Sequence, residues 1–157
     1  MSKIKVAVIG CGNIANAAHI PAYMKNSEVE IKYFCDIILE RAEKCVEKYG
    51  CGTAVADYHD FLNDPEIEAV SVCTHNDFHS IISIDFLKAG KNVLCEKPAA
   101  RTYAEALTMQ EAQHETGNAR KLNGKAKLAF SLFAEANGKP KSQTAGRTTI
   151  KASDQRL

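Results

Sequence analysis

The sequence predicts an α/β fold built on a doubly wound parallel sheet, and three observations lead to this prediction. Short β-branched and apolar runs alternate with amphipathic helical stretches from the N-terminus to about Asn123. The first run ends in a glycine-rich turn that leads directly into a helical stretch, and the second run ends in an acid, Asp36. Strands that alternate with helices are joined by right-handed crossovers, which cover both faces of a parallel sheet.

The expected strands are short runs, and most of them are rich in Val, Ile and other apolar residues. Such runs are typical of strands that are buried on both faces of a parallel sheet. We expect six of them, in KIKVAVIG (3–10), VEIKYFCD (29–36), GTAVA (52–56), IEAVSVCT (67–74), KNVLCEKP (91–98) and ARKLN (119–123).

The stretches between these runs carry apolar residues at helical spacing, together with start and stop signals. Gly50 and Gly90 are expected to end two helices, and Thr102 with Glu105 forms a capping box that begins another. On the helix expected over 76–89, Phe78, Ile81, Ile82 and Phe86 make one apolar face. The expected helices cover 13–26, 38–49, 76–89 and 102–116, with a capped helical turn at 57–65 that Pro65 ends.

The regular alternation stops near Asn123. Residues 124–157 hold seven Lys and Arg against two Asp and Glu, whereas the rest of the chain is slightly acidic. A helix that uses Leu128, Leu132 and Phe133 is expected first, followed by a weakly structured stretch with few large apolar residues. We therefore divide the chain into a nucleotide-binding domain over 1–123 and an atypical basic tail over 124–157.

Composition excludes several classes of function. A formal net charge of +1 argues against a dedicated nucleic-acid partner, because such domains are usually strongly basic. No secretory leader and no bilayer-spanning apolar run are visible, so no membrane partner is expected. The six cysteines form no CxxC pair, which favours reduced thiols and a cytoplasmic protein.

The turn after the first strand reads GCGNIA, a G-x-G-x-x-A pattern formed by Gly10, Gly12 and Ala15. Gly10 permits the tight turn, Gly12 lets the backbone approach a pyrophosphate, and Ala15 lets the helix pack closely on the strand. The N-terminus of that helix offers free N–H groups to phosphates. The motif is weak alone, but the strand before it, the helix after it and Asp36 at the end of the second strand supply the context that dinucleotide binding requires. A plain glycine turn with a solvated acid is the structural alternative.

Asp36 ends the second strand and predicts which dinucleotide binds. A carboxylate at this position accepts hydrogen bonds from the ribose hydroxyls of adenosine and repels a 2′-phosphate. The next two residues, Ile37 and Ile38, supply no partner for such a phosphate, although Arg41 lies one turn later. NAD is therefore favoured over NADP as the cofactor.

The fourth strand opens into THNDFH at the carboxyl edge of the sheet, where open α/β sheets bind ligands. This places Thr74, His75 and Asn76 near the cofactor, with His79 one helical turn later. Metal binding by Cys73, His75 and His79 is disfavoured, because the three lack a fourth ligand and a recognised spacing. Helix capping by Asn76, with His79 merely exposed, is the plain structural alternative.

The fifth strand ends at the same edge with Glu96, Lys97 and Pro98. Pro98 keeps the chain extended at Lys97. A lysine held beside a nicotinamide can hydrogen-bond a substrate hydroxyl and assist its deprotonation. A surface ion pair between Glu96 and Lys97 is the structural alternative.

Together, KVAVIGCGNIA, CD at 35–36, YHDFLNDPEIEAVSVCTHNDFH and AGKNVLCEKPAA resemble the Gfo/Idh/MocA family of NAD(P)-dependent sugar and polyol oxidoreductases. The resemblance covers about 3–123 and implies a Rossmann domain. It also implies a catalytic lysine, Lys97, that reaches a sugar or polyol substrate. The implied cofactor-binding residues are Gly10, Gly12, Asn13, Ile14, Asp36, Thr74, His75, Asn76, His79, Glu96, Lys97 and Pro98. Where His75 stands, the family commonly has proline.

The resemblance also implies what this chain lacks. Family members resemble two-domain proteins more than twice as long, in which a second domain supplies a further acid–base residue and most of the substrate pocket. Truncation or rearrangement of the gene and a reading-frame change near Asn123 are both open interpretations of 124–157. Three functions follow: an NAD-dependent oxidoreductase, an NAD-binding module without turnover, and a remnant that binds no cofactor. Self-association through apolar surface is a further open expectation.

Overall fold

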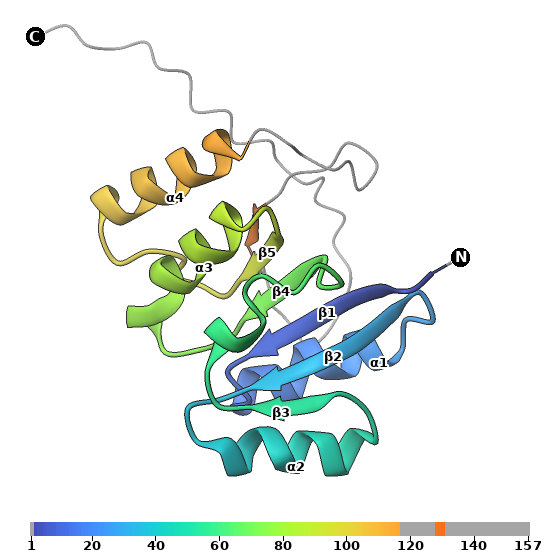
Figure 1. The fold of residues 1–157 in the computed structure, drawn as a ribbon. Coiled ribbons are helices and arrows are strands. Elements are labelled where there is room, and N and C mark those ends of the chain that lie inside the picture. The colour runs from blue at the N-terminus through green and yellow to red at the C-terminus, as the bar shows by residue number, and fades with distance from the viewer. Residues whose placement is uncertain (1, 117–127, 131–157) are drawn as a thin grey trace, which may run out of the picture.

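The computed structural model describes residues 2–116 and 128–130, and it confirms the expected α/β fold with a parallel sheet (Figure 1). The strand order is β3-β2-β1-β4-β5-β6, and all neighbouring strands pair in parallel. The order reverses between β1 and β4, which is the place where open sheets of this kind form a crevice. The strands are β1 (Ile4–Ile9), β2 (Val29–Cys35), β3 (Thr53–Val55), β4 (Ala69–Val72), β5 (Asn92–Cys95) and β6 (Leu128–Phe130).

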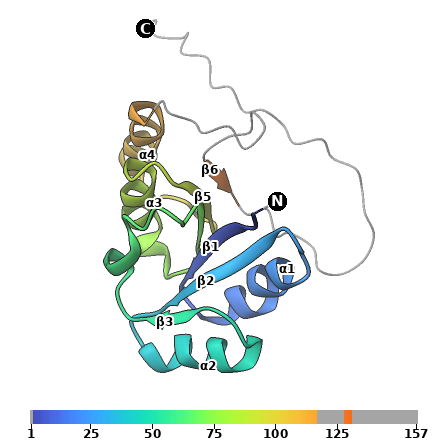
Figure 2. The ribbon, with the colours of Figure 1, turned by 45° about the vertical axis from the view of Figure 1, so that its right-hand side comes forward.

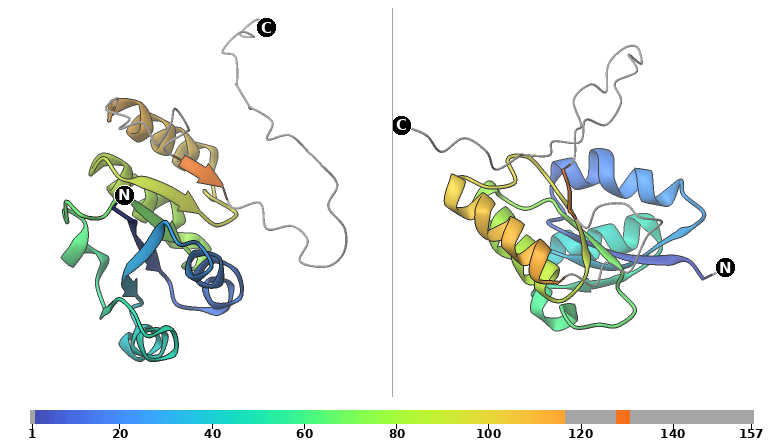
Figure 3. Two further views of the ribbon diagram at one scale, coloured as in Figure 1. Left: turned by 90° about the vertical axis from the view of Figure 1, so that its right-hand side faces the viewer. Right: turned by 90° about the horizontal axis from the view of Figure 1, so that it is seen from above.

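Helices cover both faces of the sheet, as the view from above shows (Figure 3). On one face, Ala15, Ile20, Ala42 and Cys45 join a core with side chains of β1 and β2. On the other face, α3 and α4 close a second core over β1, β4 and β5. The helical elements are η1 (Ala15–His19), α1 (Ile20–Met24), α2 (Leu39–Tyr49), η2 (Tyr58–Phe61), η3 (Asn76–Phe78), α3 (His79–Lys88) and α4 (Tyr103–Glu115).

The expected helix boundaries are largely confirmed by their caps. Gly50 follows α2 with a left-handed φ of 66°, and Asp57 caps η2 by accepting a hydrogen bond from the His59 amide. Thr102 accepts the amide of Glu105 at the start of α4. The expected helix over 13–26 contains a wide π-helical turn at η1, which places His19 on the buried side. Such single π turns often occur at functional sites.

Near the C-terminus, the structure differs from the sequence-based prediction in the position of the sixth strand and in the element that contains Leu128. The run ARKLN, expected as the sixth strand, lies outside the described residues. The sixth strand is instead β6, which pairs with β5 at the edge of the sheet (Figure 2). The helix expected to include Leu128 is therefore replaced by strand at 128–130, because the open edge of β5 offers backbone partners that helical periodicity does not reveal.

The hydrogen-bond ladder continues one residue past the strand ends and aligns the chain along one edge. The amide of Gly10 donates to Cys35, that of Cys73 to Ile9, and that of Glu96 to Val72. The residues that follow β1, β2, β4 and β5 therefore stand side by side at the carboxyl edge. Within the described residues, no helix is long and apolar enough to cross a membrane.

Candidate functional site

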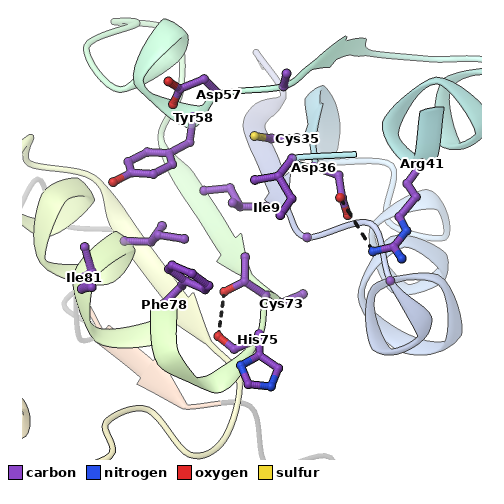
Figure 4. Close-up of a pocket in the computed structure, with 16 residues that line it drawn as sticks. Ile9, Cys35, Asp36, Arg41, Asp57, Tyr58, Cys73, His75, Phe78 and Ile81 are labelled. Atoms are coloured by element: carbon purple, nitrogen blue, oxygen red, sulfur yellow. Dashed lines mark hydrogen bonds and ion pairs between the residues drawn. The ribbon is translucent and has the colours of Figure 1, made fainter. Parts of the chain in front are cut away.

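A cavity of about 720 Å³ opens at the carboxyl edge of the sheet (Figure 4). Its lining comes from the segments that follow β1, β2, β3 and β4, together with the first turn of α3. Five of the predicted cofactor residues line it: Gly10, Gly12, Asp36, Thr74 and His75. The remaining lining residues are Ile9, Cys35, Ile37, Arg41, Ala56, Asp57, Tyr58, Cys73, Phe78, Ile81 and Ile82.

The two glycines of the turn after β1 have different environments. Gly10 has a left-handed φ of 89°, and a Cβ atom there would lie 2.6 Å from the carbonyl oxygen of Cys73. At Gly12, a Cβ atom would meet nothing within 4 Å. Gly10 is therefore required by the fold, whereas the absence of a side chain at Gly12 leaves backbone open to the cavity. Asn13 and Ile14 are exposed at the helix start, outside the lining.

Asp36 is fixed by the backbone around it. One carboxylate oxygen accepts the amide of Cys11 at 2.9 Å, and the other accepts the amide of Ile38 at 2.9 Å. The residue is 7% exposed and Arg41 approaches it to 3.9 Å (Figure 4). Because a carboxylate can accept about four hydrogen bonds, Asp36 keeps acceptor capacity for a ligand while its position is set by the glycine turn.

An apolar wall stands opposite Asp36. Phe78 and Ile81 are 51% and 53% exposed and point into the cavity, although their spacing predicted a packing face (Figure 4). Only Ile82 and Phe86 of that expected face are buried. Tyr58 completes the wall, and its hydroxyl donates to Asp85 at 2.6 Å. Burial and this hydrogen bond raise the pKa of Tyr58, so its phenol stays protonated.

The cysteines of the cavity wall do not offer a nucleophile. Burial raises the pKa of the Cys35 thiol to about 12 and also raises the pKa of Cys73. Cys11, in the neighbouring glycine turn, has a pKa raised by burial as well. Thiols in this state are poor nucleophiles at neutral pH. Across residues 2–116, no group of three or more His, Cys, Asp or Glu side chains is placed to hold a metal ion.

The segment after β4 divides into exposed and buried parts. Thr74 and His75 line the cavity, and Nδ1 of His75 lies 3.3 Å from a carboxylate oxygen of Asp77. Asn76 is exposed and begins η3. His79 is 1% exposed, which corrects the alternative that it is merely a surface side chain. Its Nδ1 lies 2.7 Å from the carbonyl oxygen of Pro98, and its Nε2 lies 2.9 Å from that of Thr74.

The three residues after β5 stand beside the cavity and outside its lining. Lys97 and Pro98 are exposed, whereas Glu96 is 5% exposed. Glu96 places Oε1 at 2.8 Å from His19 Nε2, and its Oε2 accepts the amide of Lys97 at 3.1 Å. Glu96 is buried rather than on the surface, and its contact with His19 joins two segments that are 77 positions apart in the sequence.

Sequence reasoning missed His19 and its partner Ser71, which lie together beneath this turn. His19 Nδ1 is 3.2 Å from Ser71 Oγ, and Ser71 Oγ is 2.5 Å from the hydroxyl of Tyr23. His19 is 2% exposed and Ser71 is fully buried. Buried polar groups need partners, so a serine in the middle of an apolar strand was a signal that could have been used. The cavity residues after β3, Ala56 to Tyr58, were also missed.

Taken as chemistry, the cavity combines an open glycine backbone, a fixed carboxylate and an apolar wall. The open glycine backbone suits a phosphate, the fixed carboxylate suits vicinal hydroxyls, and the apolar wall suits a flat ring.

Comparison with known proteins is consistent with a site for a dinucleotide. Residues 4–123 match the family model GFO_IDH_MocA, described as an oxidoreductase family with an NAD-binding Rossmann fold.

Individual relatives are similar over the same region. The chain is 34% identical over 116 residues to a D-glucoside 3-dehydrogenase from Escherichia coli K12, covering 74% of this chain and 33% of that protein. It is also 34% identical over 116 residues to an inositol 2-dehydrogenase from Salmonella paratyphi B, covering 73% and 34%.

A solved structure shows the same arrangement of elements. The crystal structure of KijD10, a 3-ketoreductase from Actinomadura kijaniata in complex with NADP, superposes with a TM-score of 0.69 at 30% identity. The match covers 74% of this chain and 35% of that protein. The chain therefore spans about a third of the length of the relatives that it matches.

Proposed function

The chain belongs to the Gfo/Idh/MocA family of oxidoreductases with an NAD-binding Rossmann fold, and from this premise we propose that it binds NAD in the cavity beside Gly10, Gly12 and Asp36. The observation that carries the proposal is the position of Asp36. Its carboxylate accepts a hydrogen bond from the amide of Cys11 inside the glycine turn, which supports a ribose site and a pyrophosphate site that are held next to each other.

NAD is proposed over NADP because of the charge and burial at Asp36. A 2′-phosphate would approach a carboxylate that is 7% exposed and already fixed by two amides. Arg41 lines the cavity on this side, and its contact with Asp36 is long at 3.9 Å. The relative from Actinomadura holds NADP, so this preference needs its own experiment.

Binding of NADH and NADPH to the wild-type chain and to Asp36→Asn tests the cofactor. Asparagine keeps one oxygen acceptor for the backbone amides but removes the charge, so we expect NADH affinity to fall about tenfold or more, the scale of a charge-assisted hydrogen bond. NADPH affinity should stay the same or increase. Fluorescence titration measures both.

Asp57→Asn is the matched control, because Asp57 is the other acid in the cavity lining and is largely exposed. It should leave the ratio of NADH to NADPH affinity unchanged. Equal losses for both cofactors in Asp36→Asn would contradict the ribose assignment, and no binding of either cofactor to the wild type would reject the proposed function.

For the reaction, we propose the chemistry of the family: hydride transfer between a C–H of a sugar or polyol and the nicotinamide, with Lys97 assisting deprotonation of the hydroxyl. Lys97 is exposed at the carboxyl edge, beside the cavity. The substrate is a small molecule of the class on which the relatives act, as the names D-glucoside 3-dehydrogenase and inositol 2-dehydrogenase state. A cytoplasmic location fits six free thiols.

The second candidate is an NAD-binding module that does not turn over. It is favoured by the coverage, because the match reaches only about a third of each relative. Hydride transfer needs a substrate carbon oriented against the nicotinamide, which is worth about 7–11 kcal/mol of the barrier. We expect these 157 residues alone to bind NAD with little or no turnover. An assay of NAD reduction over inositols, hexoses and amino sugars checks this, and robust turnover would overturn it.

A further inference from the structure

We propose that two buried histidines, His19 and His79, are positioning residues for Lys97. They reach the turn at 96–98 from opposite faces of the sheet and hold it at two points. The inference deepens the proposed function and rests on it for the role of Lys97. The hydrogen bonds themselves can be tested without any cofactor.

The first anchor runs through Glu96. His19 belongs to η1, directly after the glycine turn, and its Nε2 lies 2.8 Å from Glu96 Oε1. The second oxygen of Glu96 accepts the backbone amide of Lys97 at 3.1 Å. Because His19 and Glu96 are 2% and 5% exposed, water does not compete well for these bonds. The orientation of the Glu96 carboxylate is therefore set by His19 on η1. The carboxylate in turn orients the amide of Lys97.

Ser71 in turn orients His19. Its hydroxyl lies 3.2 Å from His19 Nδ1 and 2.5 Å from the hydroxyl of Tyr23, which is part of α1. A ring nitrogen bonded on one side fixes which way the other nitrogen points. The chain of contacts thus begins at Tyr23 on α1, which continues η1 from the glycine turn, and ends at the backbone amide of Lys97.

The second anchor runs through Pro98. His79 begins α3 on the opposite face, and its Nδ1 lies 2.7 Å from the carbonyl oxygen of Pro98. The other ring nitrogen lies 2.9 Å from the carbonyl oxygen of Thr74, which lines the cavity. Both partners are backbone carbonyl oxygens, one beside each ring nitrogen. His79 thereby ties the turn of Lys97 to the cavity wall.

Substitution of each histidine by asparagine or by glutamine allows its two hydrogen bonds to be tested one at a time. The amide nitrogen of glutamine stands in for Nε2 and that of asparagine for Nδ1. His19→Gln therefore keeps the contact with Glu96, whereas His19→Asn keeps only the contact with Ser71. At the second anchor the roles are reversed: His79→Asn keeps the bond to Pro98, and His79→Gln keeps the bond to Thr74.

Hydrogen exchange of the 94–101 segment in the full chain without cofactor is the readout. His19→Asn, which releases the turn by removing a bond to the Glu96 carboxylate, should raise exchange of the Lys97 amide by about tenfold or more. His79→Gln releases the turn by removing a bond to a neutral carbonyl and should raise it by about three- to tenfold. His19→Gln and His79→Asn should change it less than about threefold. Exchange in β1 should be unaffected in all four variants.

A purely structural role of the histidines would affect both members of each pair alike, and that result would overturn the inference. Should His19→Asn fail to fold, Glu96→Gln replaces it, because it removes the charge that accepts the Lys97 amide while keeping the shape. An unchanged Lys97 amide in Glu96→Gln would equally reject the first anchor.

Acylation of Lys97 with acetic anhydride, with and without NADH, separates this inference from the proposed function. Protection of Lys97 by NADH in the wild type, lost in the two releasing variants, supports both. Protection that persists unchanged in the releasing variants overturns the positioning role and leaves cofactor binding intact. Absence of protection in the wild type rejects the proposed site of the nicotinamide, while the exchange result stands on its own.

Discussion

Gly10 and Gly12 belong to one motif but perform different physical tasks. Gly10 combines a left-handed φ of 89° with a close approach to the backbone of Cys73 and Thr74, at 2.6 to 2.8 Å from an added Cβ. These neighbours are main-chain atoms, so they cannot rotate away as the end of a flexible side chain could. Gly12 has open space around it and faces the cavity.

Gly10→Ala is therefore expected to lower the free energy of unfolding by about 2–4 kcal/mol, from left-handed strain and overpacking together. Gly12→Ala should leave the free energy of unfolding within about 0.5 kcal/mol of wild type, yet weaken NADH binding. Urea unfolding and fluorescence titration measure the two effects. A loss of stability in Gly12→Ala as large as that in Gly10→Ala would contradict this division of roles.

Single residues were predictable from the sequence where a local motif defines their task. Gly10, Gly12 and Asp36 follow from the strand–turn–helix pattern, and all three line the cavity. The sequence did not single out His19, because its partners come from distant segments: His19 contacts Ser71 and Glu96 across 52 and 77 positions. The burial of His79, likewise, has no local signature. Hydrophobic periodicity indicates which face of a helix is buried, but it does not indicate which polar groups of other segments will contact that face.

At the scale of elements, α4 is held to the domain by few buried side chains. Only Met109 and Ala112 are buried among the residues of this helix. Its N-terminus is correspondingly well bonded: Thr102 accepts the amide of Glu105, and Glu105 accepts the amide of Arg101 and the hydroxyl of Ser80 on α3. A large share of the stability of α4 therefore depends on its cap.

Thr102→Ala should lower the free energy of unfolding by about 1 kcal/mol and speed amide exchange within α4. Thr108→Ala is the control, because this exposed threonine donates to Ala104 inside the helix and caps nothing. It should be neutral or slightly stabilising, since alanine is the better helix former. Equal effects of the two substitutions, measured by urea unfolding, would show that the cap contributes little.

Elements were predictable where periodicity and caps agree, as in α2 with its closing Gly50. The C-terminal part failed for a physical reason. Leu128 and its neighbours can satisfy helical spacing, yet the structure pairs them with Val93 to Cys95 of β5. Strand formation here depends on a partner that lies more than thirty residues earlier, and local patterns carry no information about that partner.

At the scale of the whole molecule, Asp64 connects segments that the sheet alone does not join. Its carboxylate accepts hydrogen bonds from Lys32 at 2.5 Å, Tyr33 at 2.9 Å and the amide of Glu66 at 2.9 Å. Its carbonyl oxygen accepts Lys91 at 2.6 Å, just before β5. Burial alone would raise the pKa of Asp64, but the hydrogen bonds outweigh it and lower the pKa to about 2.

The sign of the resulting pH dependence follows from this depressed pKa. The unfolded carboxyl titrates near pH 4, so the ionised form stabilises the fold fully above that pH. The stabilisation is lost as the pH falls from about 4 through about 2. Asp64→Asn should lower the free energy of unfolding by about 1–2 kcal/mol at pH 7, a value reduced by partial solvent exposure.

Urea unfolding between pH 2 and pH 7 measures the effect. The difference between the wild type and Asp64→Asn should shrink steadily as the pH falls from about 4 to about 2, because protonation of the carboxyl removes the charge that asparagine lacks. Lys32→Met is the reciprocal variant: loss of its ammonium raises the pKa of Asp64 and should flatten the slope of stability between pH 4 and pH 2 in the same way. A wild-type slope retained in both variants would mean that Asp64 does not hold β2 and the entry to β5 together.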